Sequence, residues 1–281
     1  MNKPIRRHLH EQLKHLSKAD VHIHSNHSDG RPTIEEILYY VQHQTDLDVI
    51  AITDHDTITG ALLAKELMAK KKYRFELIVG EEVSSNEGHI LGLFLTEKIE
   101  PNQPAHEVIK QIHAQGGIAI AAHPFYKSRM NNGKVIWAKG VGATTLIQEK
   151  THFNAIETVN ATPTFEQENL RAKYINRLLL LRAETGSSDA HILQAIAKGY
   201  TLFEGKTALA FKEAVLGHQT QAMNDKWDAM GVLRYAYFFL PTGLRSSFNT
   251  LIHGRRKKEL DIVKFPSKRV LRKEVNSESA E

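Results

Sequence analysis

The chain contains no cysteine, so disulfide bonds, thiolate metal ligands and cysteine nucleophiles are all excluded. It also lacks any run of about 18 apolar residues, the length that a membrane-spanning helix needs, and has no apolar stretch of signal-peptide length near its N-terminus. We therefore expect a cytoplasmic protein without a transmembrane segment. Any metal site in it must use nitrogen and oxygen ligands.

The first 230 residues lack an excess of charge, because 26 Lys and Arg stand against 27 Asp and Glu. The net charge of +5 comes from the remaining residues, which hold 11 Lys and Arg against 5 Asp and Glu. Binding of long nucleic acids needs several cations held together on one surface. The charge distribution therefore argues against a broad nucleic-acid-binding face in the first 230 residues.

What the chain does have is a regular alternation of short β-type runs and helical patterns between residues 19 and 203, which is typical of βα units. The expected strands lie near 19–24, 49–54, 77–83, 89–95, 118–123, 155–159 and 182–187. The expected helices cover 34–41 (after a capping box of Thr33 and Glu36), 57–72, 104–114, 163–179 and 207–216. Only a turn-like segment, 85–88, separates the third and fourth runs, which predicts an antiparallel hairpin.

Most of these apolar runs end in histidine or a carboxylate. Buried strands have no general reason to end in this way, because imidazole and carboxylate groups are costly to desolvate unless they are paired or bind a metal. Their convergence is typical of a multinuclear metal site, and it favours a metal-dependent hydrolase. The residues at the ends of the runs are His22, His24, Asp54, His55, Glu82, His123, Asp189 and His191.

Since polar residues follow nearly every strand, a closed barrel accounts for them better than an open sheet with a single switch point. We expect an α/β fold, a distorted seven-stranded (β/α) barrel with a short C-terminal extension. Residues 1–18 would be a helical lead with an apolar stripe, 19–220 the barrel, and 127–151 a lid or insertion over its mouth. Residues 221–281 would be the basic extension, with a helix near 227–240 and a disordered end from 266.

Six motifs then carry a resemblance to a known family, and they occur in the family's order and spacing. The chain resembles the polymerase and histidinol phosphatase (PHP) family over roughly residues 19–217, including the segment AIETVNA before the last motif. One HxH pair is weak support, but six motifs in order are strong. The motifs are HIHSNHSDG, ITDHD, GEEVS, GHILG, AHP and SSDAH.

The resemblance implies a distorted seven-stranded barrel that hydrolyses phosphoesters with up to three metal ions. By motif position, a first ion would be held by His22, His24, Glu82 and Asp189. Glu82 would bridge to a second ion, completed by His89 and His123, and a third would be held by Asp29, His55 and His191. Glu81 and His27 stand beside assigned ligands, and either could substitute for or supplement its neighbour.

A cluster of this kind would bind hydroxide between ions and stabilise the charge that builds on a phosphoryl group, so no amino-acid nucleophile is required. The mixed ligand set suits Mn, Fe or Zn. Asp54 is a candidate for orienting a histidine or for proton transfer, or else a helix cap. Lys127 and Arg129, just after His123, are candidate phosphate contacts, or else solvated loop charges.

These observations favour a metal-dependent phosphoesterase acting on a small phosphorylated metabolite or nucleotide. A second interpretation is an exonuclease on short oligonucleotides, because the same site can cleave a diester. A third is a metal-stabilised regulatory or membrane-surface module, in which the basic C-terminal segment contacts an anionic surface. The aromatic residues of that segment are Tyr235, Tyr237, Phe238 and Phe239.

Overall fold

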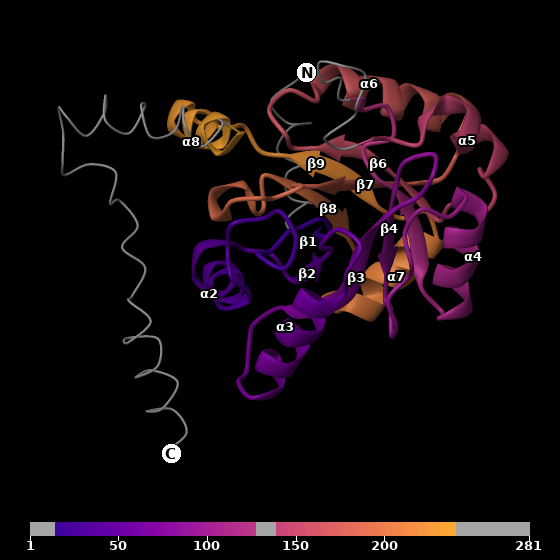
Figure 1. Cartoon of the computed structure of the whole chain (residues 1–281). Coiled ribbons are helices and arrows are strands. Elements are labelled where there is room, and N and C mark those ends of the chain that lie inside the picture. Colours follow the sequence, from indigo (N-terminus) through magenta and orange to yellow (C-terminus); the bar gives the residue numbers. More distant parts are fainter. Residues whose placement is uncertain (1–14, 128–138, 240–281) are drawn as a thin grey trace. The chain divides into compact units, whose positions relative to one another are not determined.

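Short buried runs of the sequence form the strands of one mixed sheet (Figure 1). A computed structural model describes residues 15–127 and 139–239. All seven expected strands are present within these residues, and two more follow them. The strands are β1 (Ser17–Asp20), β2 (Val49–Ile52), β3 (Glu76–Ser84), β4 (His89–Leu93), β5 (Ile118–Ala121), β6 (Ala155–Asn160), β7 (Ala183–Ser187), β8 (Gly199–Phe203) and β9 (Gln221–Asn224).

The strand order is β7-β6-β5-β4-β3-β2-β1-β8-β9. Strands β1, β2 and β3 run parallel to one another, as do β5, β6 and β7. β4 is antiparallel to both of its neighbours, and Ser84 of β3 pairs with His89 of β4, which confirms the predicted hairpin. β8 is antiparallel to β1 and to β9. The sheet is therefore of the βα type, with antiparallel strands at β4 and at one edge.

The two ends of the sheet approach each other, so that it forms a nearly closed barrel. The Thr201 hydroxyl of β8 accepts from the Gly186 amide of β7 at 3.0 Å and donates to the Gly186 carbonyl at 2.9 Å. The expectation of seven strands is wrong, because β8 and β9 extend the sheet to nine. β9, with the sequence QAMN, lies beyond residue 220 and has no β-branched or aromatic residue to indicate a strand. The division into domains stays a prediction.

The helices expected between residues 34 and 239 are present, and most of them lie around the outside of the sheet (Figure 1). The predicted capping box is confirmed: the Glu36 amide donates to Thr33 Oγ1 at 3.3 Å, and Glu36 Oε2 accepts from the Thr33 amide at 2.9 Å. The helices are α2 (Ile34–Gln44), α3 (Thr59–Ala69), α4 (Ala105–Ala114), α5 (Gly142–Gln148), α6 (Glu166–Ile175) with its π-helical continuation η1 (Asn176–Leu180), the 3-10 turn η2 (Leu193–Ala195), α7 (Ala208–Leu216) and α8 (Ala229–Phe239).

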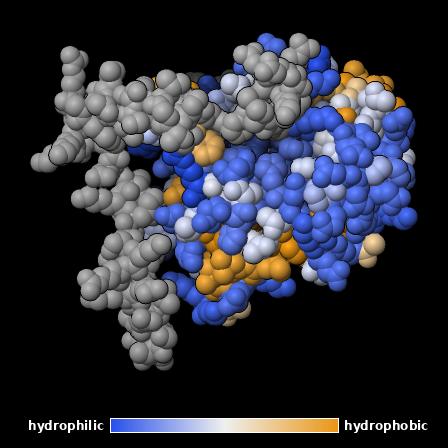
Figure 2. Space-filling model, viewed as in Figure 1, coloured by the Kyte–Doolittle hydropathy of each residue, from blue (hydrophilic) through white to orange (hydrophobic). Residues whose placement is uncertain are grey.

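The core combines small and branched strand residues with aromatic residues of β8 and α7. Phe203 and Phe211 are fully buried and meet edge to face, with ring centroids 5.5 Å apart. Both faces of the central strands are buried, because every residue of β2, β5 and β6 is buried. Figure 2 shows a largely hydrophilic surface with a hydrophobic area over the position of α3. In the described part of the chain, no helix is long and apolar enough to cross a membrane.

Some predicted features fall outside the described residues. These are Arg129, most of the predicted N-terminal helical lead at 1–18, the middle of the predicted lid at 127–151, and the basic segment from residue 240 onward. In the described part of the lid, Lys127 forms an isolated antiparallel bridge with Lys139, and α5 follows. The second of two compact units begins at Leu233, within α8.

Candidate metal centre

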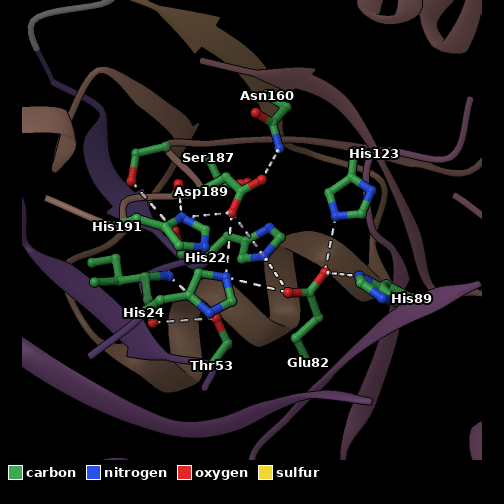
Figure 3. Close-up of polar contacts among 12 residues, drawn as sticks. His22, His24, Thr53, Glu82, His89, His123, Asn160, Ser187, Asp189 and His191 are labelled. Atoms are coloured by element: carbon green, nitrogen blue, oxygen red, sulfur yellow. Dashed lines mark hydrogen bonds and ion pairs between the residues drawn. The ribbon is translucent and has the colours of Figure 1, made fainter. Parts of the chain in front are cut away.

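The topology of the sheet places histidines and carboxylates at the edge where the parallel strands end. The parallel strands β1, β2, β5 and β7 each place their candidate ligands just after their last residue, and β3 carries Glu82 near its end. β4 runs in the opposite direction, so its first residue, His89, lies at the same edge. All nine residues expected to bind metal therefore meet at one mouth of the barrel. Figure 3 labels all of them except Asp29 and His55. Their assignment as ligands stays a prediction.

Glu82 is fully buried at the centre of this cluster. Its Oε1 lies 2.9 Å from both His89 Nδ1 and His123 Nε2. Its Oε2 lies 3.1 Å from His22 Nε2 and 3.2 Å from both His24 Nε2 and His55 Nδ1. One carboxylate thus faces five imidazole rings, three on one oxygen and two on the other. This arrangement suits a carboxylate that bridges two ions.

Two more carboxylates extend the cluster on either side of His24. Asp189 Oδ1 lies 3.2 Å from His24 Nε2, and the loop residue Asp29 places its Oδ1 3.2 Å from His191 Nε2. The Asp29 loop packs tightly on the segment that follows β1, because a Cβ at Gly30 would lie 2.5 Å from the His24 carbonyl oxygen. Glycine at this position lets the loop bring Asp29 over the cluster.

Four groups of side chains have ligand atoms close enough to hold a metal ion, and together they contain all nine expected residues. The grouping differs in part from the three-ion assignment. His22 joins Glu82 and His123 as well as His24 and Asp189, while His24 also joins the group of Asp29. The groups are His22, Glu82 and His123; His22, His24 and Asp189; His55, Glu82 and His89; and His24, Asp29, His55 and His191.

Unpartnered buried atoms show that this cluster fits metal ions. In the described part of the chain, His22 Nε2, both ring nitrogens of His24 and Glu82 Oε2 are buried without a hydrogen bond of acceptable geometry. Although His22 Nε2 is 3.1 Å from Glu82 Oε2, its orientation does not form such a bond. Buried polar atoms without partners are costly. A cation between these atoms would satisfy them, and the imidazole and carboxylate set suits transition metals.

The electrostatics of the cluster favour anionic carboxylates. Burial alone would raise the pKa of Glu82, but the surrounding histidines, His55 and His22 foremost, hold it well below its usual value. Burial would likewise raise the pKa of Asp189, and His22 and His24 outweigh that effect and lower it. Burial lowers the pKa of His55 to about 4, so this ring is neutral near pH 7 with a lone pair available to a metal.

Two of the candidate ligands have an unusual backbone conformation. His123 and Asp189, each just beyond the end of a strand, have positive φ angles of 26° and 51°. Positive φ is uncommon outside glycine, and asparagine, aspartate and histidine adopt it more often than other residues. At both positions the chain turns sharply out of the strand, which directs the side chain into the barrel mouth instead of along the sheet.

The other expected site residues lie at or near this cluster in different ways. The Asp54 carboxylate accepts from the Ser25 amide at 2.7 Å, the Ser25 hydroxyl at 2.7 Å and the Ser28 hydroxyl at 2.6 Å. In the described residues these bonds fix the loop that leads to Asp29, and none of them joins Asp54 to a histidine. Glu81 points away from Glu82 and accepts from the Ile99 amide at 2.9 Å. His27 is exposed.

Sequence reasoning missed a buried polar network beside the cluster, formed by Glu157, Asn160 and Ser187 on β6 and β7 (Figure 3 labels the last two). Glu157 contacts His22, and Asn160 donates to Asp189 Oδ2 at 3.1 Å. A signal was present, because a carboxylate and an amide within the fully buried run AIETVN need buried partners. Glu157 lies inside β6, whereas the pattern considered above was confined to strand ends. Asn160 and Ser187 are the last residues of β6 and β7, but they are neither histidines nor carboxylates.

Comparisons with known proteins identify the family of the chain. The family model described as "PHP domain" matches residues 20–229. An uncharacterized protein of Methanocaldococcus jannaschii is 39% identical over 118 residues, which cover 38% of this chain and 68% of that protein. The 5′-3′ exoribonuclease of Escherichia coli is 27% identical over 222 residues, which cover 62% of this chain and 74% of that enzyme.

A solved structure is similar in fold. It is a two-domain protein from Bacteroides vulgatus described as containing a predicted PHP-like metal-dependent phosphoesterase, and it superposes with a TM-score of 0.57 at 20% identity. The match covers 80% of this chain and 69% of that one. At this level of identity the likeness concerns the fold alone.

Proposed function

The chain belongs to the PHP domain family and is a metal-dependent phosphoester hydrolase, and from this premise we propose that it acts on a small phosphorylated metabolite or nucleotide. The observation that carries the proposal is Glu82, one buried carboxylate facing five imidazole rings at the mouth of the barrel. With its neighbours it would hold two to three ions of Mn, Fe or Zn.

The residues of this chain have distinct proposed tasks. His22, His24, Glu82, Asp189, His89, His123, Asp29, His55 and His191 would hold the ions. When bound, the ions would lower the pKa of water and stabilise charge on the phosphoryl group. Asp54 would hold the Ser25 to Ser28 loop and thereby Asp29. Lys127 is exposed near the mouth and, with Arg129, would contact phosphate oxygens.

Exonucleolytic cleavage of short oligonucleotides is the second candidate function. It is favoured by the similarity to the E. coli 5′-3′ exoribonuclease over 74% of that enzyme's length. The near-neutral charge of the first 230 residues favours a short or small substrate over long nucleic acid. Family membership favours both enzymatic interpretations over the non-enzymatic module, and binding of an anionic surface by the basic C-terminal segment stays a proposal.

One panel of substrates tests both functions. Purified protein loaded with Mn²⁺ would be assayed on phosphomonoesters, 3′,5′-bisphosphates and 5′-phosphorylated oligonucleotides of two to five nucleotides, before and after treatment with a strong chelator. We expect activity that the chelator abolishes and Mn²⁺ restores. Preference for monoesters or bisphosphates supports the first function, and stepwise release of mononucleotides supports the second. Activity that is indifferent to the chelator would contradict both.

A further inference from the structure

Glu157 lies on β6 beside the candidate metal centre, but it is not one of the expected ligands. Its side chain is buried, and four donors point at its carboxylate. Oε1 accepts from His22 Nδ1 at 3.0 Å and from the Ser187 hydroxyl. Oε2 accepts from the His123 amide at 2.6 Å and from Asn160 Nδ2 at 3.1 Å. Two of these four donors belong to candidate metal ligands.

The contact with His22 decides which nitrogen of that ring can bind a metal. A carboxylate oxygen 3.0 Å from Nδ1 is an acceptor, so Nδ1 carries the proton. Nε2 then has a free lone pair, and it points into the cluster, 3.1 Å from Glu82 Oε2 and 3.6 Å from Asp189 Oδ1. His22 is shared by two of the four candidate metal groups, so its tautomer matters for both.

Asn160 links Glu157 to a second candidate ligand, Asp189, through hydrogen bonds. Its amide nitrogen lies 3.1 Å from Glu157 Oε2 and 3.1 Å from Asp189 Oδ2. Only the NH₂ end of the side chain can stand between two carboxylates, because an amide oxygen there would meet only acceptors. With Oδ2 of Asp189 bound to this donor, Oδ1 is directed to His24 Nε2 at 3.2 Å.

We propose that Glu157 is a positioning residue that, together with Asn160, holds His22, His123 and Asp189 in ligating geometry. This inference rests on the proposed metal site. Outer carboxylates of this kind fix the tautomer and orientation of a ligating histidine, and their loss weakens metal binding by about 10 to 100-fold. Glu157 contacts the imidazole ring of His22 and the backbone amide of His123, and it acts on Asp189 through Asn160.

The first test is the affinity for Zn²⁺ of Glu157→Gln, measured by competition with a chromogenic chelator. Glutamine keeps the shape of the side chain, but its NH₂ group must face donors at one of the two oxygen positions. We expect Zn²⁺ binding to weaken by about 10 to 100-fold. The matched control is Thr158→Val. Thr158 is the next residue of β6 and is also buried, and its hydroxyl has no hydrogen-bond partner in the described residues, so Zn²⁺ affinity should not change.

The second test is a long-range ¹H–¹⁵N NMR spectrum of the His22 ring in the Zn²⁺-loaded wild-type protein. We expect the proton on Nδ1 and the metal on Nε2, a signature that a merely space-filling Glu157 would not impose. Because it uses only the wild type, this test holds even if Glu157→Gln does not fold.

A proton on Nε2 of His22, or Zn²⁺ affinity of Glu157→Gln within twofold of the wild type, would overturn the role of Glu157. A wild-type protein that binds no Zn²⁺, Mn²⁺ or Fe²⁺ would instead overturn the proposed function. The two failures are therefore distinguishable.

Discussion

Replacing Glu82 with glutamine tests the candidate centre at the side chain that contacts the most histidines. The change keeps the shape of the side chain, but it removes the negative charge that both oxygens present to five rings. Removing one partner of a buried ion pair costs about 3–5 kcal/mol. If the interaction operates fully in the transition state, kcat/KM should fall by about 10² to 10⁴-fold.

Glu81→Gln is the matched control, because it makes the same chemical change one residue away on the same strand. Glu81 faces away from the cluster, and its carboxylate binds the Ile99 amide. We expect kcat/KM on a small phosphomonoester to stay within about threefold of the wild type, since no candidate ligand loses a contact. Both variants would be compared at saturating Mn²⁺. Equal losses in the two variants, or a larger loss for Glu81→Gln, would refute the assignment of Glu82 as the bridging carboxylate.

Three further predictions follow from other contacts. Asp54→Ala removes three hydrogen bonds that hold the Ser25 to Ser28 loop, so elemental analysis should show the loss of about one metal equivalent per chain. Full metal content in this variant would contradict the role of Asp54. Burial raises the pKa of Glu81 from 4.5 to about 7, so its ionisation opposes folding as pH rises through that range. In thermal melts, the Tm of Glu81→Gln relative to that of the wild type should therefore increase as the pH is raised from 4.5 to 7. A Tm at pH 8 that is no higher than that of the wild type would contradict the raised pKa. A chain ending after Phe239 loses ten Lys and Arg and five Asp and Glu but no candidate ligand. Its kcat on a small phosphomonoester should stay within about twofold of the wild-type value, and its salt-dependent binding of oligonucleotides should fall. Loss of turnover in a soluble, metal-loaded truncation would refute this prediction.

The sequence was sufficient to predict elements whose signal is local. The capping box of Thr33 and Glu36 is confirmed, because both of its hydrogen bonds join residues three apart. The nine candidate ligands could be chosen because they follow or begin apolar runs, and the structure brings them together at one edge. β9 could not be predicted, since its residues, QAMN, become a strand only through pairing with β8.

Polar contacts between residues far apart in the chain could not be predicted from the sequence either. Glu157 contacts a histidine 135 residues earlier in the chain, and no spacing rule connects two such positions. The role proposed for Asp54 also changed with the structure, because a carboxylate next to a histidine in sequence turned out to bind serines of a neighbouring loop. Sequence patterns thus indicated which residues gather at the site, whereas their hydrogen-bond partners could be identified only from the structure.

The positive φ angles of His123 and Asp189 limit how this centre can evolve. At an ordinary backbone position, a ligand can be exchanged for any side chain that reaches the metal. At these two positions a replacement must also tolerate left-handed backbone, which favours histidine, aspartate, asparagine and glycine and disfavours β-branched residues. Of these four, only histidine and aspartate are strong ligands for a transition metal. Exchange between those two is therefore the accessible mutational route by which a descendant of this protein could change its metal preference at these strand ends.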